Sequence, residues 1–177
     1  MTTQTFPLAP MNRLAPLVLV VPAAGIALAV LVAPREQATP LPMLATAFMF
    51  ALVIAGPLLG LLRRRITLDG HTLVVAATAY TQRIPVDAFD LDSARVVDLD
   101  ERTEFRPMLG INRFGLPGFR AGYYVLRNRV RGFCLLTRFQ RVLVLPRRDG
   151  RFVLLSPEQP QALLSRLREL AATPTRG

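Results

Sequence analysis

The sequence is poor in the residue types that make disulfides, metal sites and most catalytic centres. Its 177 residues include one cysteine, one histidine and no tryptophan, and aromatic residues make up only 7% of the chain. Cys134 cannot form an intramolecular disulfide, and His71 cannot by itself build a zinc site, which draws on several cysteine or histidine ligands. We therefore expect no disulfide, no bound metal and no cofactor.

Lysine is also absent, so all 22 basic residues are arginines, and they outnumber the 12 acidic residues to give a net charge of +10. The charge is unevenly distributed. Residues 87–104 hold seven acidic residues and two arginines, whereas residues 105–151 hold eleven arginines and one acidic residue. This contrast predicts a basic surface that either is only solvated or binds an anionic partner.

Two long runs near the start of the chain, 14–34 and 41–62, contain no charged residue. About 20 residues in helical conformation cross the roughly 30 Å hydrocarbon core of a bilayer, so each run is long enough to span it. The runs therefore predict a hairpin of two transmembrane helices over residues 14–62. A secretory signal is the less favoured interpretation of the first run, because the run is longer than a signal core and a second run follows at once.

Arginines directly after the second run predict the orientation of this hairpin. Under the positive-inside rule, a basic cluster marks the cytoplasmic end of a span. We therefore expect residues 1–13 and 63–177 to be cytoplasmic, and we assign the role of topology determinants to Arg63, Arg64 and Arg65.

After residue 65, short apolar runs alternate with turn residues, which predicts a small β domain. Asp69-Gly70 is typical of a hairpin turn, and extended segments are expected near Ile84 and Val96. Four closely spaced runs predict an antiparallel meander: 122–126, 132–137, 141–145 and 151–155. We expect about seven strands in all.

The chain closes with a predicted helix. Ser156 is suited to the N-cap and Pro157 to the first helical position. An apolar stripe, which we expect to cover the open end of the sheet, follows in this helix at Leu163, Leu167 and Leu170.

One glycine- and arginine-punctuated run, RFGLPGFRAGYY at 113–124, is followed by RFVLLSP at 151–157. Together with two spans before the strands and a helix after them, this order resembles the bacterial pleckstrin-homology-like membrane proteins of uncharacterised function. The resemblance implies a mainly-β pleckstrin-homology-like split barrel with a C-terminal capping helix, held at the bacterial inner membrane as a multi-pass protein with both termini cytoplasmic. It implies no catalytic residues.

The predicted function is non-catalytic. We expect an integral membrane protein whose cytoplasmic domain binds anionic lipid headgroups, since each arginine near an anionic leaflet contributes about 1 kcal/mol. The arginines expected to lie on turns that meet lipid are Arg127, Arg129, Arg131, Arg147 and Arg148. The alternative is a scaffold or regulatory module that binds a membrane protein, or a second copy of the chain, through an exposed strand edge.

Other functions have weaker support in the sequence. Aromatic residues interleave with Arg113 and Arg120 as in a surface that stacks on nucleic-acid bases, but in a strand-rich domain we expect them in the core and expect no nucleic acid: Phe114, Phe119, Tyr123 and Tyr124. No Gly-Lys-Ser/Thr follows the nearby glycines, so we interpret these as turn formers rather than a phosphate cradle: Gly110, Gly115, Gly118 and Gly122.

Catalytic and calcium sites are also not expected. The serines lack a nucleophile-elbow context, and the single histidine lies in a tight hairpin. The following acidic residues lack the spacing of a calcium loop and favour a solvated loop: Asp98, Asp100, Glu101 and Glu104.

Overall fold

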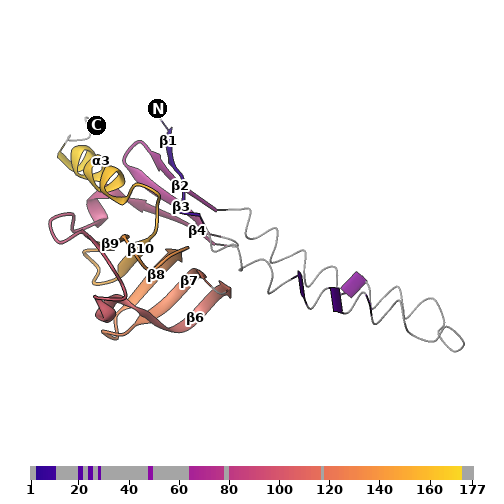
Figure 1. Ribbon diagram of the computed structural model, residues 1–177. Helices are drawn as coiled ribbons and strands as arrows, with labels where there is room; N and C mark the ends of the chain where they lie inside the picture. The colour runs from indigo at the N-terminus through magenta and orange to yellow at the C-terminus, as the bar shows by residue number, and fades with distance from the viewer. Residues whose placement is uncertain are drawn as a thin grey trace, which may run out of the picture.

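The computed structural model shows a mainly-β unit built from two sheets and a C-terminal helix (Figure 1). This β unit is described over residues 3–10, 64–77, 80–116 and 118–172. Between its first two stretches, seven further residues are described, all in helical conformation: 20, 21, 24, 25, 28, 48 and 49.

The prediction of a two-helix transmembrane hairpin is contradicted. In the part of the chain that the structure describes, no helix is both long and apolar enough to cross a membrane. The helix α3 (Pro160–Ala172) has 13 residues and carries charged side chains, whereas a span needs about 20 mostly apolar residues. Most of the predicted hairpin, 14–62, lies outside the described residues. The multi-pass inner-membrane location that followed from it is contradicted for the same reason.

The smaller sheet has four antiparallel strands in the order β1-β2-β3-β4. β2 (Arg64–Asp69) and β3 (Thr72–Ala77) form the predicted hairpin, and Gly70 at its turn has a φ of 55°, which favours a residue without Cβ. β4 (Tyr80–Pro85) pairs with β3. Buried residues alternate with more exposed ones and give the sheet one apolar face, made of Ile66, Leu68, Leu73, Val75 and Ile84.

The N-terminal segment is an integral part of this sheet, although no strand is predicted there. β1 (Thr3–Phe6) pairs antiparallel with β2. The next residues join the far end of the chain, since the backbone N–H of Ala9 donates to the carbonyl of Ser156 at 3.0 Å and the N–H of Glu158 donates to Pro7 at 2.9 Å. Residues 3–9 thus connect the smaller sheet to the segment before α3.

The larger sheet has six strands in the order β5-β9-β10-β8-β7-β6. Short 3-10 helices, η2 (Val86–Ala88) and η3 (Thr103–Phe105), flank β5. The strands along the chain are β5 (Arg95–Val97), β6 (Pro107–Leu116), β7 (Phe119–Leu126), β8 (Arg131–Leu136), β9 (Val142–Pro146) and β10 (Phe152–Leu155).

The predicted meander is wrong in one respect, because β8 and β9 are not neighbours. β10 lies between them, parallel to β8 and antiparallel to β9. Residues 137–141 connect β8 to β9 across two strand spacings, about 10 Å, which a chain rising roughly 3.3 Å per residue can span. The short connection therefore makes β8 and β9 run in opposite directions, but it does not require them to be hydrogen-bonded neighbours.

The centre of the larger sheet is buried on both faces. The first face packs against the smaller sheet and α3 and carries Phe133, Leu135, Leu143, Leu145, Val153 and Leu155. The second face packs against Leu99 and Phe105 and carries Cys134, Leu136, Val142, Val144 and Leu154. Nearly uninterrupted apolar runs in β8, β9 and β10 are typical of strands covered on both sides.

The C-terminal helix α3 covers one end of the first face, where it contacts β9, β5 and η2. Its predicted apolar stripe is confirmed: Leu163 and Leu167 are buried and Leu170 is partly buried. The predicted helix start is wrong, because α3 begins at Pro160 and the hydroxyl of Ser156 accepts a hydrogen bond from the backbone N–H of Thr137 at 2.7 Å. Residues 156–158 instead form backbone contacts with the N-terminal segment, and the helix begins only after them.

Candidate anion-binding site

Three arginines stand in one row at the ends of neighbouring strands of the larger sheet: one begins β8, one directly follows β9 and one directly precedes β10. Each lies two positions from a residue of the first face, and side chains two apart on a strand point to the same side. Phe152 of β10 pairs with Gly132 of β8 and with Pro146 of β9, which aligns the residues next to them. These aligned residues, called the pocket arginines below, are Arg131, Arg147 and Arg151.

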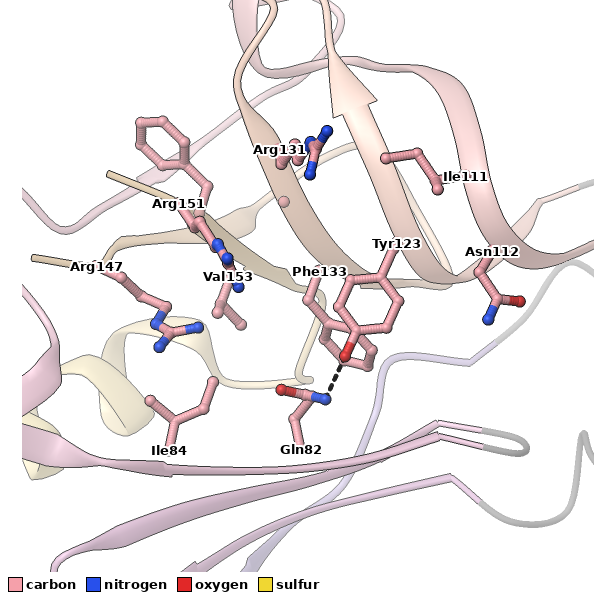
Figure 2. Close-up of a pocket in the computed structure, with 12 residues that line it drawn as sticks. Gln82, Ile84, Ile111, Asn112, Tyr123, Arg131, Phe133, Arg147, Arg151 and Val153 are labelled. Carbon is pink, nitrogen blue, oxygen red and sulfur yellow. Dashed lines mark hydrogen bonds between the residues drawn. The ribbon is translucent and has the colours of Figure 1, made fainter. Parts of the chain in front are cut away.

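The pocket arginines line a cavity of about 220 Å³ between the first face and strand β4 (Figure 2). Gln82 and Ile84 of β4 form the opposite wall, and Tyr123 of β7 closes one end. No aspartate or glutamate is among the described residues that line the cavity. The described lining therefore presents three positive side chains and no negative one.

Among the described residues, one carboxylate outside the cavity partly neutralises this row. Oδ2 of Asp149 lies 2.9 Å from Nη2 of Arg147 and 3.9 Å from Nε of Arg151. Nε of Arg147 is buried and has no hydrogen-bond partner among the described residues. Like charges on neighbouring strands are unfavourable, so the row leaves an excess of positive charge that an anion would neutralise.

The other walls of the cavity are of two kinds. Ile84, Phe133 and Val153 make one part apolar. On the opposite side, Nε2 of Gln82 donates a hydrogen bond to the hydroxyl of Tyr123, so that the side-chain oxygen of Gln82 is directed toward the cavity (Figure 2). The cavity thus suits a group with an anionic end and an uncharged remainder.

The structure brings together only some of the arginines predicted to bind lipid. Arg131 and Arg147 line the cavity. Arg127 and Arg129 lie on the turn between β7 and β8 and are not among its lining residues. Arg148 lines a different cavity, which it shares with Asp87, Asp90 and Asp92.

Arg151 is the site residue that sequence reasoning missed. In a meander, β8 and β9 would be adjacent and Arg151 would lie outside the pair. The insertion of β10 places it between Arg131 and Arg147. The sequence does indicate that these arginines share a face of the sheet. Each arginine is two positions from a buried apolar residue of its own strand, in the same alternating pattern.

Two of the three residues predicted as topology determinants lie in β2. Arg64 and Arg65 are its first two residues, whereas Arg63 lies outside the described residues. The guanidinium of Arg64 lies over the ring of Phe119, 5.6 Å from its centroid, and partial burial lowers the pKa of Arg64 from its ordinary value.

A second group of arginines packs against the aromatic residues of the second face. Arg106 and Arg120 lie over the ring of Phe139, 5.4 and 5.0 Å from its centroid, and Arg95 lies 5.2 Å from the centroid of Phe105. Cations within about 6 Å of a ring centroid are attracted to its face. Arg95, Arg106 and Arg120 are called the stacked arginines below.

The acidic stretch forms surface ion pairs. Asp100 lies 3.4 Å from Arg106, and Glu104 lies 3.7 Å from Arg102. Across the described ranges, no three histidine, cysteine, aspartate or glutamate side chains are grouped so as to hold a metal ion.

The aromatic residues weighed as base-stacking platforms divide between the core and the cavity. Phe119 and Tyr124 are buried, as predicted, while Tyr123 lines the cavity. The side chain of Phe114 lies outside the described residues.

Of the four glycines predicted as turn formers, only Gly118 lies at a turn, with a φ of 76° between β6 and β7. Gly110 and Gly115 lie inside β6, and Gly122, with a φ of 115°, lies inside β7. The strand β6 was therefore missed in the sequence because its glycines were interpreted as turns.

Comparisons of the chain with protein-family models, with curated proteins and with solved structures give no match. The resemblance to bacterial pleckstrin-homology-like membrane proteins is thus supported by no related protein, and its two-span part is contradicted by the structure. The fold is corrected to a mainly-β architecture that, in its described part, ends in one helix and has no N-terminal helical hairpin.

Proposed function

We propose that the β unit is a non-catalytic binding module that holds a phosphate-bearing anion between its pocket arginines. The observation that carries this proposal is the alignment of three arginines at the ends of adjacent strands, beside a cavity that no described carboxylate lines. Guanidinium groups form paired, charge-assisted hydrogen bonds with phosphate oxygens.

The size of the cavity favours a compact ligand. Its volume of about 220 Å³ is below the roughly 300 to 1,000 Å³ of pockets that enclose drug-sized ligands. A lipid headgroup and a small soluble phosphate ester would both offer the required anion, and the apolar wall would cover the uncharged part next to it.

The rival function, recognition of a protein through a strand edge, has less support from the described strands. β5 has three residues and β1 has four, so both edges are short. β4 ends in a proline, and β6 has two register irregularities. Short, bulged or proline-bearing edges hinder the addition of another strand.

The proposal is tested by isothermal titration calorimetry of the purified full-length chain with glycerol 1-phosphate, at about 0.15 M salt to screen distant charges. One variant combines Arg131→Gln with Arg151→Gln. Its matched control combines Arg127→Gln with Arg129→Gln, which removes the same charge from the exposed turn outside the cavity. Since a hydrogen bond to a charged group contributes about 1.5–3 kcal/mol, we expect the first variant to lose tenfold or more in affinity and the control to lose less than about twofold.

Equal losses in the two variants would show that the overall charge, rather than the cavity, attracts phosphate. The absence of binding to the unmodified protein would overturn the proposal. Thermal unfolding of both variants verifies that neither loss reflects misfolding.

A further inference from the structure

Three large apolar side chains are exposed together on the edge strand β6. Met108 is 57% exposed, Leu109 61% and Ile111 58%. Among the described residues from 64 onward, no other large apolar side chain is similarly exposed. Met108, Leu109 and Ile111 are called the apolar ridge below.

Two bulges in β6 create this ridge. Pro107 pairs with Leu126 and Leu109 with the adjacent Val125, so Met108 is an extra residue in the ladder. A second irregularity between Gly110 and Asn112 makes Ile111 extra in the same way. Bulges re-aim side chains, and here Met108 and Leu109 are both exposed although a regular strand would direct these neighbours to opposite faces.

The apolar ridge adjoins the proposed phosphate site. Ile111 lines the same cavity as the pocket arginine Arg131, and Figure 2 shows its side chain on β6 at the rim of the cavity. The ridge and the phosphate site are therefore continuous through one residue.

The segment of the chain that carries the ridge is basic, although Asp100 pairs with Arg106 just before β6 at 3.4 Å. Residues 105–148, which include β6, β7, β8 and β9, contain no aspartate or glutamate. Arg120 of the neighbouring strand donates from Nη1 to the carbonyl of Pro107 at 2.8 Å, at the base of the ridge. Apolar side chains beside cationic ones match a surface whose apolar interior lies beneath anionic phosphates.

We infer that the apolar ridge inserts into the surface of an anionic phospholipid bilayer while the pocket arginines hold a lipid phosphate. This inference rests on the proposed function and names the source of the phosphate. The bulges that expose the ridge also interrupt the regular ladder that a partner strand would need, so the edge fits a fluid lipid surface better than a β-strand of another protein. Its unbranched Met108 adapts readily to an irregular environment.

The chain contains no tryptophan, which allows a local fluorescence test. Met108→Trp is introduced into the full-length protein, with Leu109→Trp as a second probe in case the first disturbs the bulge. Gln161→Trp is the matched control, because it lies exposed on α3, which packs near β5 and β9 at the opposite edge of the larger sheet. The vesicles are phosphatidylcholine, alone or with phosphatidylglycerol, carrying brominated acyl chains as quenchers.

We expect the emission of the Met108→Trp and Leu109→Trp variants to move to shorter wavelength and to be quenched with phosphatidylglycerol present, and to change little with phosphatidylcholine alone. The Gln161→Trp control should not respond, and adding Arg131→Gln with Arg151→Gln to the Met108→Trp variant should reduce its response. If the ridge probes behave like the control while glycerol 1-phosphate still binds in the calorimeter, the inference is overturned and the proposed function stands. If the unmodified protein does not bind glycerol 1-phosphate, the proposed function itself is overturned.

Discussion

Arginines on the two faces of the larger sheet have different surroundings. On the second face, the stacked arginines lie over Phe105 and Phe139, and the apolar cluster beneath them includes the fully buried Cys134. On the first face, the pocket arginines face a cavity, with Asp149 as the nearby carboxylate. The same residue type thus packs on aromatic rings on one side of the sheet and lines a cavity on the other.

This contrast shows that arginine density alone does not locate a ligand site. The charge of Arg106 is matched by Asp100 at 3.4 Å, and Arg120 donates to a backbone carbonyl at 2.8 Å. Among the pocket arginines, Asp149 pairs with Arg147 at 2.9 Å and lies 3.9 Å from Arg151. Each group therefore has one carboxylate among the described residues, and the difference between the groups is the cavity that the pocket arginines line. The position of the arginines beside a cavity, rather than their number, is what marks the candidate site.

The largest expected effect concerns the closure of the second face. Burial raises the pKa of the Cys134 thiol, and the nearby charge of Arg120 offsets this only in part. Only the thiolate reacts, so we expect the native protein to react with a thiol reagent at pH 8 about a thousandfold or more slowly than the protein unfolded in guanidinium chloride. Rapid native labelling would show that the second face is open.

The same shift sets a pH dependence. The unfolded thiol ionises near pH 8.5, whereas the buried thiol stays protonated. The contribution of Cys134 to stability is therefore fully present below that pH and decreases as the pH rises above it.

The next effect separates the two groups of arginines directly. Arg120→Gln removes the contact with Phe139 and the hydrogen bond to Pro107, so we expect the free energy of unfolding to fall by about 1–2 kcal/mol with unchanged affinity for glycerol 1-phosphate. The matched variant Arg131→Gln should change the free energy of unfolding by less than about 0.5 kcal/mol and weaken phosphate binding. Urea unfolding and calorimetry measure the two quantities. If both variants lowered stability and affinity together, the separation of roles would be wrong.

The smallest effect concerns the carboxylate next to the pocket arginines. Asp149→Asn keeps a side-chain oxygen for the hydrogen bond from the backbone N–H of Arg151 but removes the charge that pairs with Arg147. Because half-exposed ion pairs contribute about 0.2–1 kcal/mol, we expect the affinity for glycerol 1-phosphate to rise about two- to fivefold. A decrease in affinity would indicate that Asp149 holds the arginines in place more than it competes with the anion.

Much of the strand content was predictable from local pattern. The hairpin at Asp69-Gly70, the extended segments near Ile84 and Val96, and the amphipathic helix all follow from residue spacing, and the structure confirms them. The order of strands was not predictable in the same way, because apolar spacing does not reveal which strands become neighbours. Uninterrupted apolar runs at 142–145 and 153–155 do indicate central strands buried on both faces.

Two strands escaped prediction for identifiable reasons. β1 is a short, mostly polar segment, Thr3–Phe6, whose place depends on pairing with residues sixty or more positions away. β6 contains Gly110 and Gly115 and two bulges, so its sequence lacks the regular alternation of a strand. In both cases tertiary contacts, rather than local preference, determine the structure.

The candidate site was predictable only in part. Arg131 and Arg147 were identified from their position near turns, but Arg127, Arg129 and Arg148 were grouped with them on the same grounds and lie elsewhere. The pocket arginines can be grouped only when the register of β8, β9 and β10 is known, because the register determines which arginines lie next to one another on neighbouring strands.

The central claim, that the pocket arginines hold a phosphate anion, is tested most directly by nuclear magnetic resonance of the side-chain Nε–H groups in arginine-labelled protein titrated with glycerol 1-phosphate. We expect the signals of Arg131, Arg147 and Arg151 to shift together and to saturate, while those of Arg95, Arg106 and Arg120 stay in place. Equal shifts across both groups, or shifts confined to the stacked arginines, would contradict the account.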